Sequence, residues 1–406
     1  MDLFFTITNL ADILGVSIRT IETRVKNGSL FLEYDNKGRA GFSYNQLQFI
    51  PIIDEMASDN WEKEFSVIPK REYSSIELFA GGGGLAIGME KAGFKHILLN
   101  EFDKSACDTL IHNRPDWNVV LDDVHNVDFT PYKGKVDLLT GGFPCQAFSY
   151  AGNKAGFNDT RGTLFFELAR AVNETQPIVF MGENVKGLFT HDEGKTLKVI
   201  REAIKDLGYT LIEPRVLKAI LYQVPQKRER LFLVAIRNDV YRDSIFSWPS
   251  PYHRVLTLTD AFYKGILYNC DVPDSPFQSY PKRKAEIMAM VPMGGNWNNL
   301  PLDIQKEYLK GSFHLGGGKT GIARRLSLDE PSLTLTCAPA MKQTERCHPI
   351  ENRPLSVREY ARIQTFPDEW EFMGNMTAQY KQIGNAVPVN LAFAMGRSLV
   401  RLLNYI

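Results

Sequence analysis

The chain has 406 residues, of which 44% are hydrophobic and 23% charged, and its 47 basic and 47 acidic residues give a formal net charge of zero. This length allows two or three domains, and a neutral protein can still carry a local basic face, so the net charge does not exclude a nucleic-acid partner. We expect a cytoplasmic protein without a membrane span, a disulfide framework or a metal site, because the apolar runs are short and the five cysteines form no CxxC pair.

The first 53 residues have a self-contained pattern of two short helices. Residues 8–14 show helical spacing, Gly15 interrupts it, and Ser17 is a suitable N-cap for a second helix over 18–28. Two helices joined by a glycine turn predict a helix-turn-helix.

Two short strands are expected around Asn36-Lys37-Gly38, which would add a wing to this helix pair. The order resembles the winged helix-turn-helix of MerR-type and excisionase-type regulators. This resemblance implies that the second helix enters a DNA major groove and exposes Arg19 and Arg24. The alternative is a small helical cap that docks on the main domain.

Residues 54–73 are charged and show no clear period, so they are expected to form a linker. From 74 to 238, apolar runs of strand length alternate with helical patterns. The expected strands are 75–80, 96–102, 136–143, 177–185 and 230–237, and the expected helices include 84–93, 165–174 and 194–208. Apolar strands between helices are typical of a doubly wound α/β domain with a parallel sheet, whose ligands bind beyond the carboxyl ends of the strands.

Residues 239–347 carry scattered aromatics, prolines and glycines, which predict a smaller, loop-rich second lobe. Helical patterning returns over 348–406, and this segment is expected to rejoin the α/β core.

A glycine-rich loop follows the first expected strand of the core. Gly81, Gly83 and Ala86 satisfy G-x-G-x-x-A, and Glu101 ends the next strand about twenty residues on. This pattern predicts a nucleotide-containing cofactor whose ribose binds a carboxylate. It does not separate NAD from S-adenosylmethionine.

Further polar groups lie next to the other core strands. Cys145 follows one strand, within the stretch GGFPCQAFSYAG, Glu183 ends another, and Arg228 and Arg230 lie at the start of a third. A thiolate, a carboxylic acid and a guanidinium in one pocket fit methylation of cytosine at C5. The thiolate would add to C6 and make C5 nucleophilic, the acid would bind N3, and the arginine would hold O2.

The ordered set FAGGGG, GGFPCQAFS, DTRGTLFFE, ENV, QKRER, RPLSVREYARIQTFPDEW and QIGNAVP resembles the C5-cytosine-specific DNA methyltransferase family (HhaI-like). The resemblance covers about 74–238 and 345–406. It implies a fold and an activity in which S-adenosylmethionine methylates a cytosine that is flipped out of duplex DNA.

The resemblance also implies roles for single residues. Cys145 would be the nucleophile, Glu183 the group on N3, and Arg230 rather than Arg228 the group that holds the base. Glu101 would bind the ribose, Phe102 would stack on adenine, and Asp123 would accept from the adenine amino group. The full set expected at the cofactor is Phe79, Gly81, Gly83, Glu101, Phe102, Asp123, Val124, Pro144, Leu164, Asn385 and Ala386.

For DNA, the resemblance implies a loop over 146–163 that closes on the flipped base and a target-recognition domain over 239–347. The residues expected at DNA are Gln146, Ser149, Arg19, Arg24, Lys282, Arg283, Arg324 and Arg325.

The resulting prediction is a DNA (cytosine-5)-methyltransferase that acts on a short duplex sequence. The expected partners are double-stranded DNA, a companion restriction endonuclease and operator DNA, the last through the N-terminal helices. The alternatives are an RNA cytosine-5 methyltransferase and a non-catalytic DNA-binding regulator.

Overall fold

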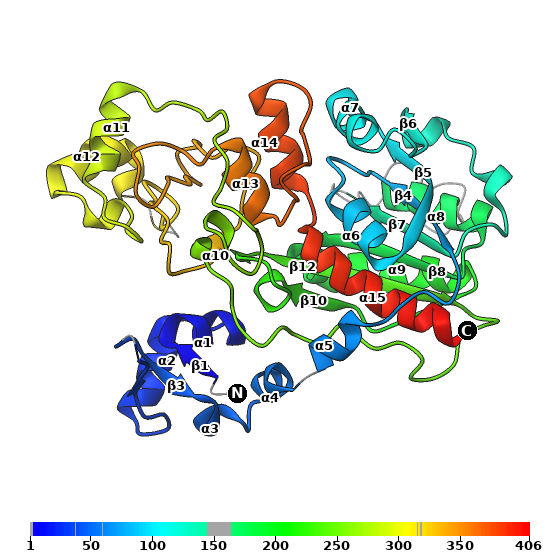
Figure 1. Ribbon diagram of the computed structural model, residues 1–406, viewed down its shortest axis with the longest axis horizontal. Helices are drawn as coiled ribbons and strands as arrows, with labels where there is room; N and C mark the ends of the chain where they lie inside the picture. The colour runs from blue at the N-terminus through cyan, green and yellow to red at the C-terminus, as the bar shows by residue number, and fades with distance from the viewer. Residues whose placement is uncertain (1–2, 37, 59, 144–163, 315, 317–318) are drawn as a thin grey trace.

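The computed structural model describes residues 3–36, 38–58, 60–143, 164–314, 316 and 319–406. Its centre is a mixed β-sheet with the strand order β10-β12-β8-β7-β4-β5-β6, in which β9 also pairs with β12 (Figure 1). The strands are β4 (Tyr73–Leu78), β5 (Phe94–Glu101), β6 (Val119–Leu121), β7 (Leu138–Gly142), β8 (Val179–Val185), β9 (Tyr209–Leu211), β10 (Arg215–Lys218) and β12 (Glu229–Arg237).

Helices cover both faces of this sheet, as expected for a doubly wound domain. One face packs against α6 (Gly84–Ala92) and α15 (Val389–Tyr405), and the other against α8 (Leu164–Thr175) and α9 (Lys195–Asp206). The helix α7 (Lys104–Asn113) packs along β5 and β6 at one sheet edge. Through α15, the C-terminal segment packs on the core sheet.

One strand direction corrects the sequence analysis. β12 runs antiparallel to β8, with Arg230 opposite Val185 and Phe232 opposite Glu183. A fully parallel sheet would have put residues that precede this strand at the opposite rim from Glu183. The antiparallel direction brings the start of β12 to the carboxyl end of β8, so the arginines and the acid lie together.

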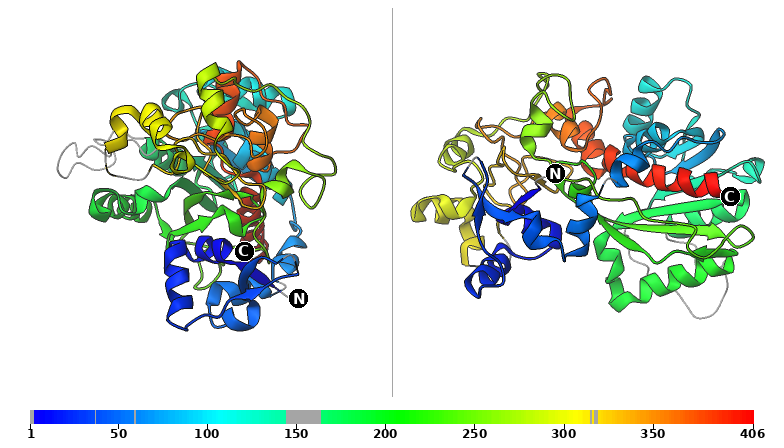
Figure 2. Two further views of the ribbon diagram at one scale, coloured as in Figure 1. Left: turned by 90° about the vertical axis from the view of Figure 1, so that its left-hand side faces the viewer. Right: turned by 60° about the horizontal axis from the view of Figure 1, so that its bottom comes forward.

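The helices α6 and α15 cross at very short range. A Cβ atom added to Gly88 would lie 2.3 Å from the Ala392 Cβ atom, so only glycine allows this approach. Figure 2 shows α15 lying along the sheet from the second lobe to the C-terminus. The contact fixes the C-terminal helix to the helix that follows the glycine loop.

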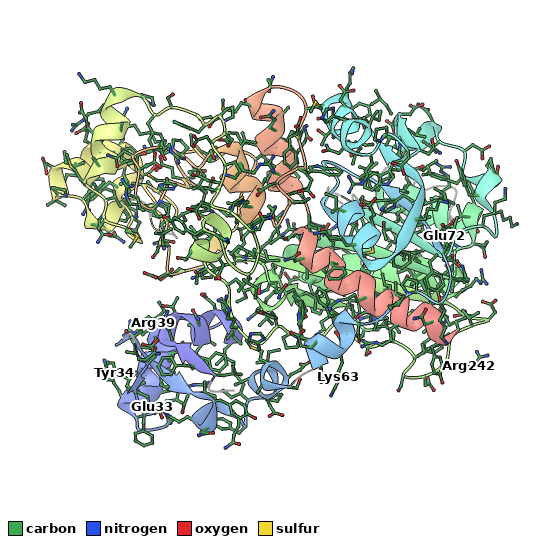
Figure 3. All side chains as sticks on the ribbon, in the orientation of Figure 1. Glu33, Tyr34, Arg39, Lys63, Glu72 and Arg242 are labelled. Carbon is green, nitrogen blue, oxygen red and sulfur yellow. The ribbon has the colours of Figure 1, made fainter. Side chains whose placement is uncertain are left out.

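Residues 3–57, which we call the N-terminal module, contain four helices and a three-stranded antiparallel sheet of order β1-β3-β2. Ser17 caps the second helix as expected, since its Oγ accepts from the Thr20 backbone N–H at 3.1 Å. Figure 3 shows Tyr34 and Arg39 of the hairpin at the outer edge of the module. The elements are β1 (Phe4–Thr6), α1 (Ile7–Leu14), α2 (Ile18–Lys26), β2 (Glu33–Tyr34), β3 (Ala40–Ser43), α3 (Tyr44–Leu47) and α4 (Pro51–Ala57).

The module docks next to the strand that carries Arg230, on residues of the neighbouring segments. The Lys218 Nζ atom donates to the backbone oxygens of Asp12, at 3.1 Å, and Ile13, at 2.7 Å. The Lys227 Nζ atom forms an ion pair with the Asp12 carboxylate at 2.8 Å. Apolar side chains of the module also belong to the same buried cluster as the sheet, so the module and the core are packed as one body.

The expected linker over 54–73 is wrong. This segment contains the end of α4 and the helix α5 (Asn60–Phe65), which packs on the core. Trp61 is buried, and the buried Glu64 accepts from the Ser250 backbone N–H and from Arg401. The partners of these two side chains are far away in sequence. The local sequence pattern therefore did not indicate that this segment packs on the core.

The second lobe is rich in loops, as expected. It contains α10 (Leu258–Phe262), α11 (Lys282–Ala289), α12 (Leu302–Leu309) and the two-residue β13 (Ser332–Leu333), which pairs with β11 (Gln226–Lys227). The chain then enters α13 (Val357–Ile363) and α14 (Met376–Asn385).

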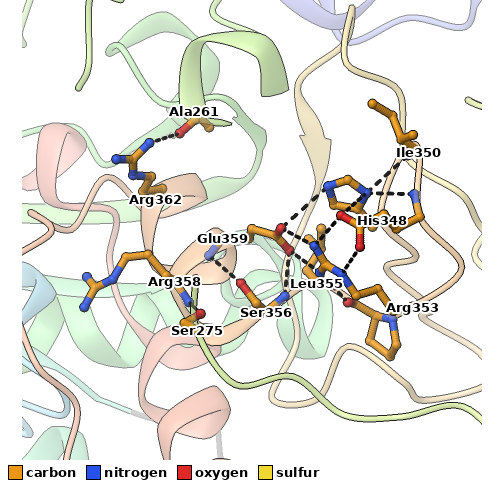
Figure 4. Close-up of polar contacts among 12 residues, drawn as sticks. Ala261, Ser275, His348, Ile350, Arg353, Leu355, Ser356, Arg358, Glu359 and Arg362 are labelled. Atoms are coloured by element: carbon orange, nitrogen blue, oxygen red, sulfur yellow. Dashed lines mark hydrogen bonds and ion pairs between the residues drawn. The ribbon is translucent and has the colours of Figure 1, made fainter. Parts of the chain in front are cut away.

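A buried polar network joins the lobe to α13 (Figure 4). The Glu359 carboxylate accepts from Arg353 at 2.7 and 2.8 Å and from the Ser356 backbone N–H at 2.7 Å, and His348 lies 3.5 Å away.

Residues 376–405 are long and apolar enough to cross a membrane by length and composition, but 78% of the most apolar window is buried within the protein.

The contact between α6 and α15 gives a stability prediction. We expect Gly88→Ala to lower the free energy of unfolding by about 1–3 kcal/mol, because the new methyl group must push the two helices apart. Urea denaturation of the purified protein measures this change. Gly311→Ala is the matched control, since a Cβ atom there meets nothing within 4 Å. Equal midpoints for the two variants would contradict the close approach.

Candidate functional site

A cavity of about 620 Å³ opens at the rim of the sheet where β4, β5, β7 and β8 end and β12 begins. Its lining includes eight of the residues expected from the sequence. They are Phe79, Gly81, Glu101, Glu183, Arg228, Arg230, Asn385 and Ala386. The structure thus brings the expected cofactor and base-binding groups into one cavity.

The glycine loop is held on both sides. On one side, Glu101 at the end of β5 accepts from the Gly81 backbone N–H at 2.7 Å and from the Phe102 and Asp103 N–H groups at 2.9 and 2.8 Å. On the other side, the Trp370 indole Nε1 donates to the Gly82 carbonyl oxygen at 3.1 Å. These bonds fix the backbone that faces the cavity.

Three residues of this turn, Phe79, Gly81 and Gly83, adopt positive φ values. Gly83 has φ 89°, and an added Cβ atom would lie 2.8 Å from the Trp370 ring. Phe79 has φ 58°, which is uncommon for a residue with a side chain and costs of order 1 kcal/mol. The packing around the loop must offset this strain, and the result places the Phe79 side chain at the cavity.

The opposite end of the cavity holds an acid and an arginine. The Arg230 Nε atom lies 2.6 Å from the Glu183 carboxylate, and both side chains are about nine-tenths buried. Burial raises the pKa of Glu183, although Arg230 and Arg228 act in the other direction. A raised pKa makes proton uptake by this carboxyl easier than in an ordinary glutamate, and the protonated form can donate a hydrogen bond.

Arg228 has a different environment from Arg230. It is fully buried, and its guanidinium donates to the backbone oxygens of Leu335 at 3.2 Å and Gly384 at 2.9 Å. Burial, followed by the charge of Arg230, lowers its pKa. Arg228 thus ties the start of β12 to the segments around Leu335 and Gly384, and Arg230 is the arginine beside the acid.

Sequence reasoning missed several residues that shape this site. Asn184 donates from Nδ2 to the Phe143 carbonyl oxygen at 2.9 Å, which fixes the chain directly before Pro144. Gln382 accepts from the Thr109 hydroxyl at 2.7 Å and packs under Gly82. Asn184 and Gln382 lie within the quoted motifs, and their position there was the available signal. Glu77, which also lines the cavity, was treated as an ordinary strand residue.

The remaining cofactor candidates lie outside the lining of this cavity. Phe102 is 74% exposed at the end of β5, and Asp123 forms a 2.6 Å contact with the His125 ring. Val124 is buried in the core, and Leu164 begins α8 with its side chain packed against the same core. Pro144, Cys145, Gln146 and Ser149 lie outside the described residues, as does the loop over 146–163.

The residues expected to contact DNA include exposed side chains and buried ones. Arg19 and Arg24 are exposed on α2, and Lys282 is exposed at the start of α11. Arg283 is also exposed, but its guanidinium pairs with Glu286 and Glu307. All of these arginines and the lysine remain accessible from solvent.

The expectation that Arg325 contacts DNA is wrong. It is buried, and it donates five hydrogen bonds to Val291, His348, Glu351, Met288 and Asn352 inside the second lobe. Its donors are therefore already used, and the residue holds the lobe together instead of facing DNA. The neighbouring Arg324 is half-buried, and its Nε atom has no partner among the described residues.

Comparisons with known proteins agree with this geometry. A family model for the C-5 cytosine-specific DNA methylase matches residues 73–401. The Type II methyltransferase M.Eco47II of Escherichia coli is 61% identical over 99% of this chain and 96% of its own length. M.PspPI of Psychrobacter sp. (strain TA137) is 58% identical over 99% and 97%. Among solved structures, a prophage-encoded DNA modification methyltransferase (E. coli) aligns with a TM-score of 0.59 and 27% identity, over 82% of this chain and 100% of that chain.

The clamp on the glycine loop gives a binding prediction. We expect Trp370→Phe to weaken S-adenosylmethionine binding about fivefold, because the Gly82 oxygen loses a hydrogen bond worth about 1 kcal/mol. Equilibrium dialysis with labelled cofactor measures the dissociation constant. Trp248→Phe is the control, because the Trp248 ring packs against Phe246 and not against the glycine loop. An unchanged constant for Trp370→Phe would show that the clamp does not shape the cofactor site.

Proposed function

The chain belongs to the C-5 cytosine-specific DNA methylase family, and from this premise we propose that it modifies one cytosine within a short duplex sequence, as the methyltransferase of a Type II restriction-modification system. The observation that carries the proposal is the buried pair of Glu183 and Arg230 in the same cavity as the glycine loop. The similarity to two Type II methyltransferases supports the biological role. We place the enzyme in the cytoplasm, where its DNA is, with a companion endonuclease as its genetic partner.

The proposed cofactor is S-adenosylmethionine, which supplies the methyl group when bound. Glu101 binds the ribose hydroxyls, and Phe102 and Asp123 bind the adenine. The residues proposed to line the remainder of the cofactor are Phe79, Gly81, Gly83, Val124, Pro144, Leu164, Asn385 and Ala386. The cavity fits such a group, since its lining joins the glycine loop, Glu101 and Asn385.

The proposed reaction begins at Cys145, whose thiolate adds to C6 of the flipped cytosine. Protonated Glu183 donates to N3 and takes up the charge that this addition drives onto the ring, and Arg230 holds the O2 oxygen. C5 then carries the electron pair that takes the methyl group. Loss of the C5 proton and cleavage of the bond between sulfur and C6 restore the aromatic ring.

A random-sequence duplex library tests the activity and the target together. After incubation with the protein and S-adenosylmethionine, conversion sequencing should find protected cytosines in one short context only. The second lobe would read that context, with Lys282, Arg283 and Arg324 as candidate contacts and Gln146 and Ser149 from the loop over 146–163. Protection of RNA cytosines with none in DNA would replace the proposal with an RNA methyltransferase.

Glu183 gives a prediction for the chemical step. We expect Glu183→Gln to lower the single-turnover rate about 100-fold or more, because an amide cannot protonate N3. The wild-type kcat/KM should fall as the pH rises through the raised pKa of Glu183, since the protonated acid is the active form. The variant should lack this fall. Glu202→Gln, at an exposed position on α9, is the control, and a wild-type pH profile for Glu183→Gln would refute the role.

We further propose that the N-terminal module is a winged helix-turn-helix that binds operator DNA and represses transcription of the enzyme's own operon. The first 72 residues lie outside the family model, yet the two relatives cover 99% of this chain and so include nearly all of them. The exposed Arg19 and Arg24 on one helix support contact with DNA. The alternative is a module that only supports the strands on which it docks.

Point variants test this idea better than a deletion, because the module shares its buried cluster with the core. We expect Arg19→Ala combined with Arg24→Ala to weaken operator binding at least tenfold, since each lost contact costs about 1–3 kcal/mol. Reporter repression should be lost while methyl transfer stays within twofold. Arg201→Ala on α9 is the control. Unchanged repression would leave the module with a supporting role only.

A further inference from the structure

Glu77 is a buried acid in the cavity that none of the proposed steps uses. It lies on β4, its side chain lines the cavity, and its residue is only 1% exposed. One carboxyl oxygen, Oε2, is enclosed and has no hydrogen-bond partner among the described residues. An enclosed, unpaired carboxyl oxygen is costly, and it suggests that a partner arrives with a ligand.

The strand order indicates which part of the ligand lies near Glu77. Glu183 ends β8, on the base side, and Glu101 ends β5, on the proposed ribose side. β7 and β4 lie between β8 and β5 in the sheet. In S-adenosylmethionine the sulfonium joins the ribose to the methyl group that moves to the base. Between these two acids, at the part of the rim that β7 and β4 occupy, is where a bound sulfonium would lie.

The surroundings of Glu77 disfavour its ionised form. Burial raises its pKa well above the usual value, and the negative charge of Glu101 adds to the rise. The Thr140 hydroxyl on β7 and the Ala86 backbone N–H on α6 lower the pKa of Glu77. The other charged groups in the cavity lining are Asp103, Glu183, Arg228, Arg230 and Lys381.

We propose that Glu77 is the counter-charge for the cofactor's sulfonium, and that it releases its proton when S-adenosylmethionine binds and takes one up again once the methyl group has left. The reaction product, S-adenosylhomocysteine, has a neutral thioether at this position, so Glu77 keeps its proton beside it. The site thereby distinguishes the charged substrate form of the cofactor from its neutral product. This inference rests on the proposed cofactor.

Isothermal titration calorimetry in buffers of different ionisation enthalpy tests the proposal, because it counts protons released on binding. We expect the wild-type protein to release more protons with S-adenosylmethionine than with S-adenosylhomocysteine. Glu77→Gln should abolish the difference, and Glu77→Asp, which keeps a carboxyl, should retain it. Glu72→Gln is the matched control, since Glu72 lies at the surface just before β4 (Figure 3).

The affinities give a second, independent readout. In Glu77→Gln the preference for S-adenosylmethionine over S-adenosylhomocysteine should fall at least roughly tenfold, which corresponds to the loss of one nearby opposite charge. Binding of S-adenosylhomocysteine should not change, because glutamine has the shape of the protonated acid, and this result also shows that the variant is folded. Equal proton release with both ligands in the wild-type protein would overturn the proposal. Failure of both ligands to bind would instead overturn the proposed cofactor.

Discussion

The ion pair between Arg230 and Glu183 depends on the reversal of a single strand. β4, β5, β7 and β8 are parallel, so their carboxyl ends deliver the glycine loop and two acids to one rim. A parallel sheet cannot deliver the beginning of another strand to that rim. Because β12 is antiparallel to β8, its first residues meet the end of β8, and Arg230 lies 2.6 Å from Glu183. The position of the cationic group in the cavity is thus a consequence of topology.

The same reversal determines what supports the cavity from behind. β10 and the N-terminal module lie beyond β12, so the contacts of Lys218 with α1 and of Lys227 with Asp12 form directly next to the arginine strand. On its other side, Arg228 holds the backbone around Leu335 and Gly384. The strand that carries Arg230 is therefore anchored by three separate parts of the chain. Such anchoring keeps a charged pair in place where water is scarce and a small displacement would be costly.

Local patterns predicted those parts of the molecule whose cause is local. The Ser17 cap, the glycine loop, the helix that follows it and the apolar strands are present as expected. The direction of β12 was not predictable, because side-chain alternation is the same for a parallel and an antiparallel strand. The helix α5 was missed because Glu64 is satisfied by residues about 190 and 340 positions away. Arg325 was misassigned because the sequence of the pair Arg324-Arg325 does not reveal where its N–H donors point. They can face solvent or bind backbone carbonyl groups.

Three glutamates, Glu101, Glu77 and Glu183, lie along the rim on β5, β4 and β8. Each has different surroundings, and these surroundings give each glutamate a different role. Glu101 accepts three backbone N–H bonds, which hold its carboxyl group against the glycine loop. Glu183 has one arginine at 2.6 Å and a raised pKa, which suits an acid that must donate a proton to a base. Glu77 has an enclosed oxygen without a partner, and its pKa is raised further by a like charge. One residue type thus meets three different needs, because backbone donors, a guanidinium and burial without a hydrogen-bond partner give the three carboxyl groups different surroundings.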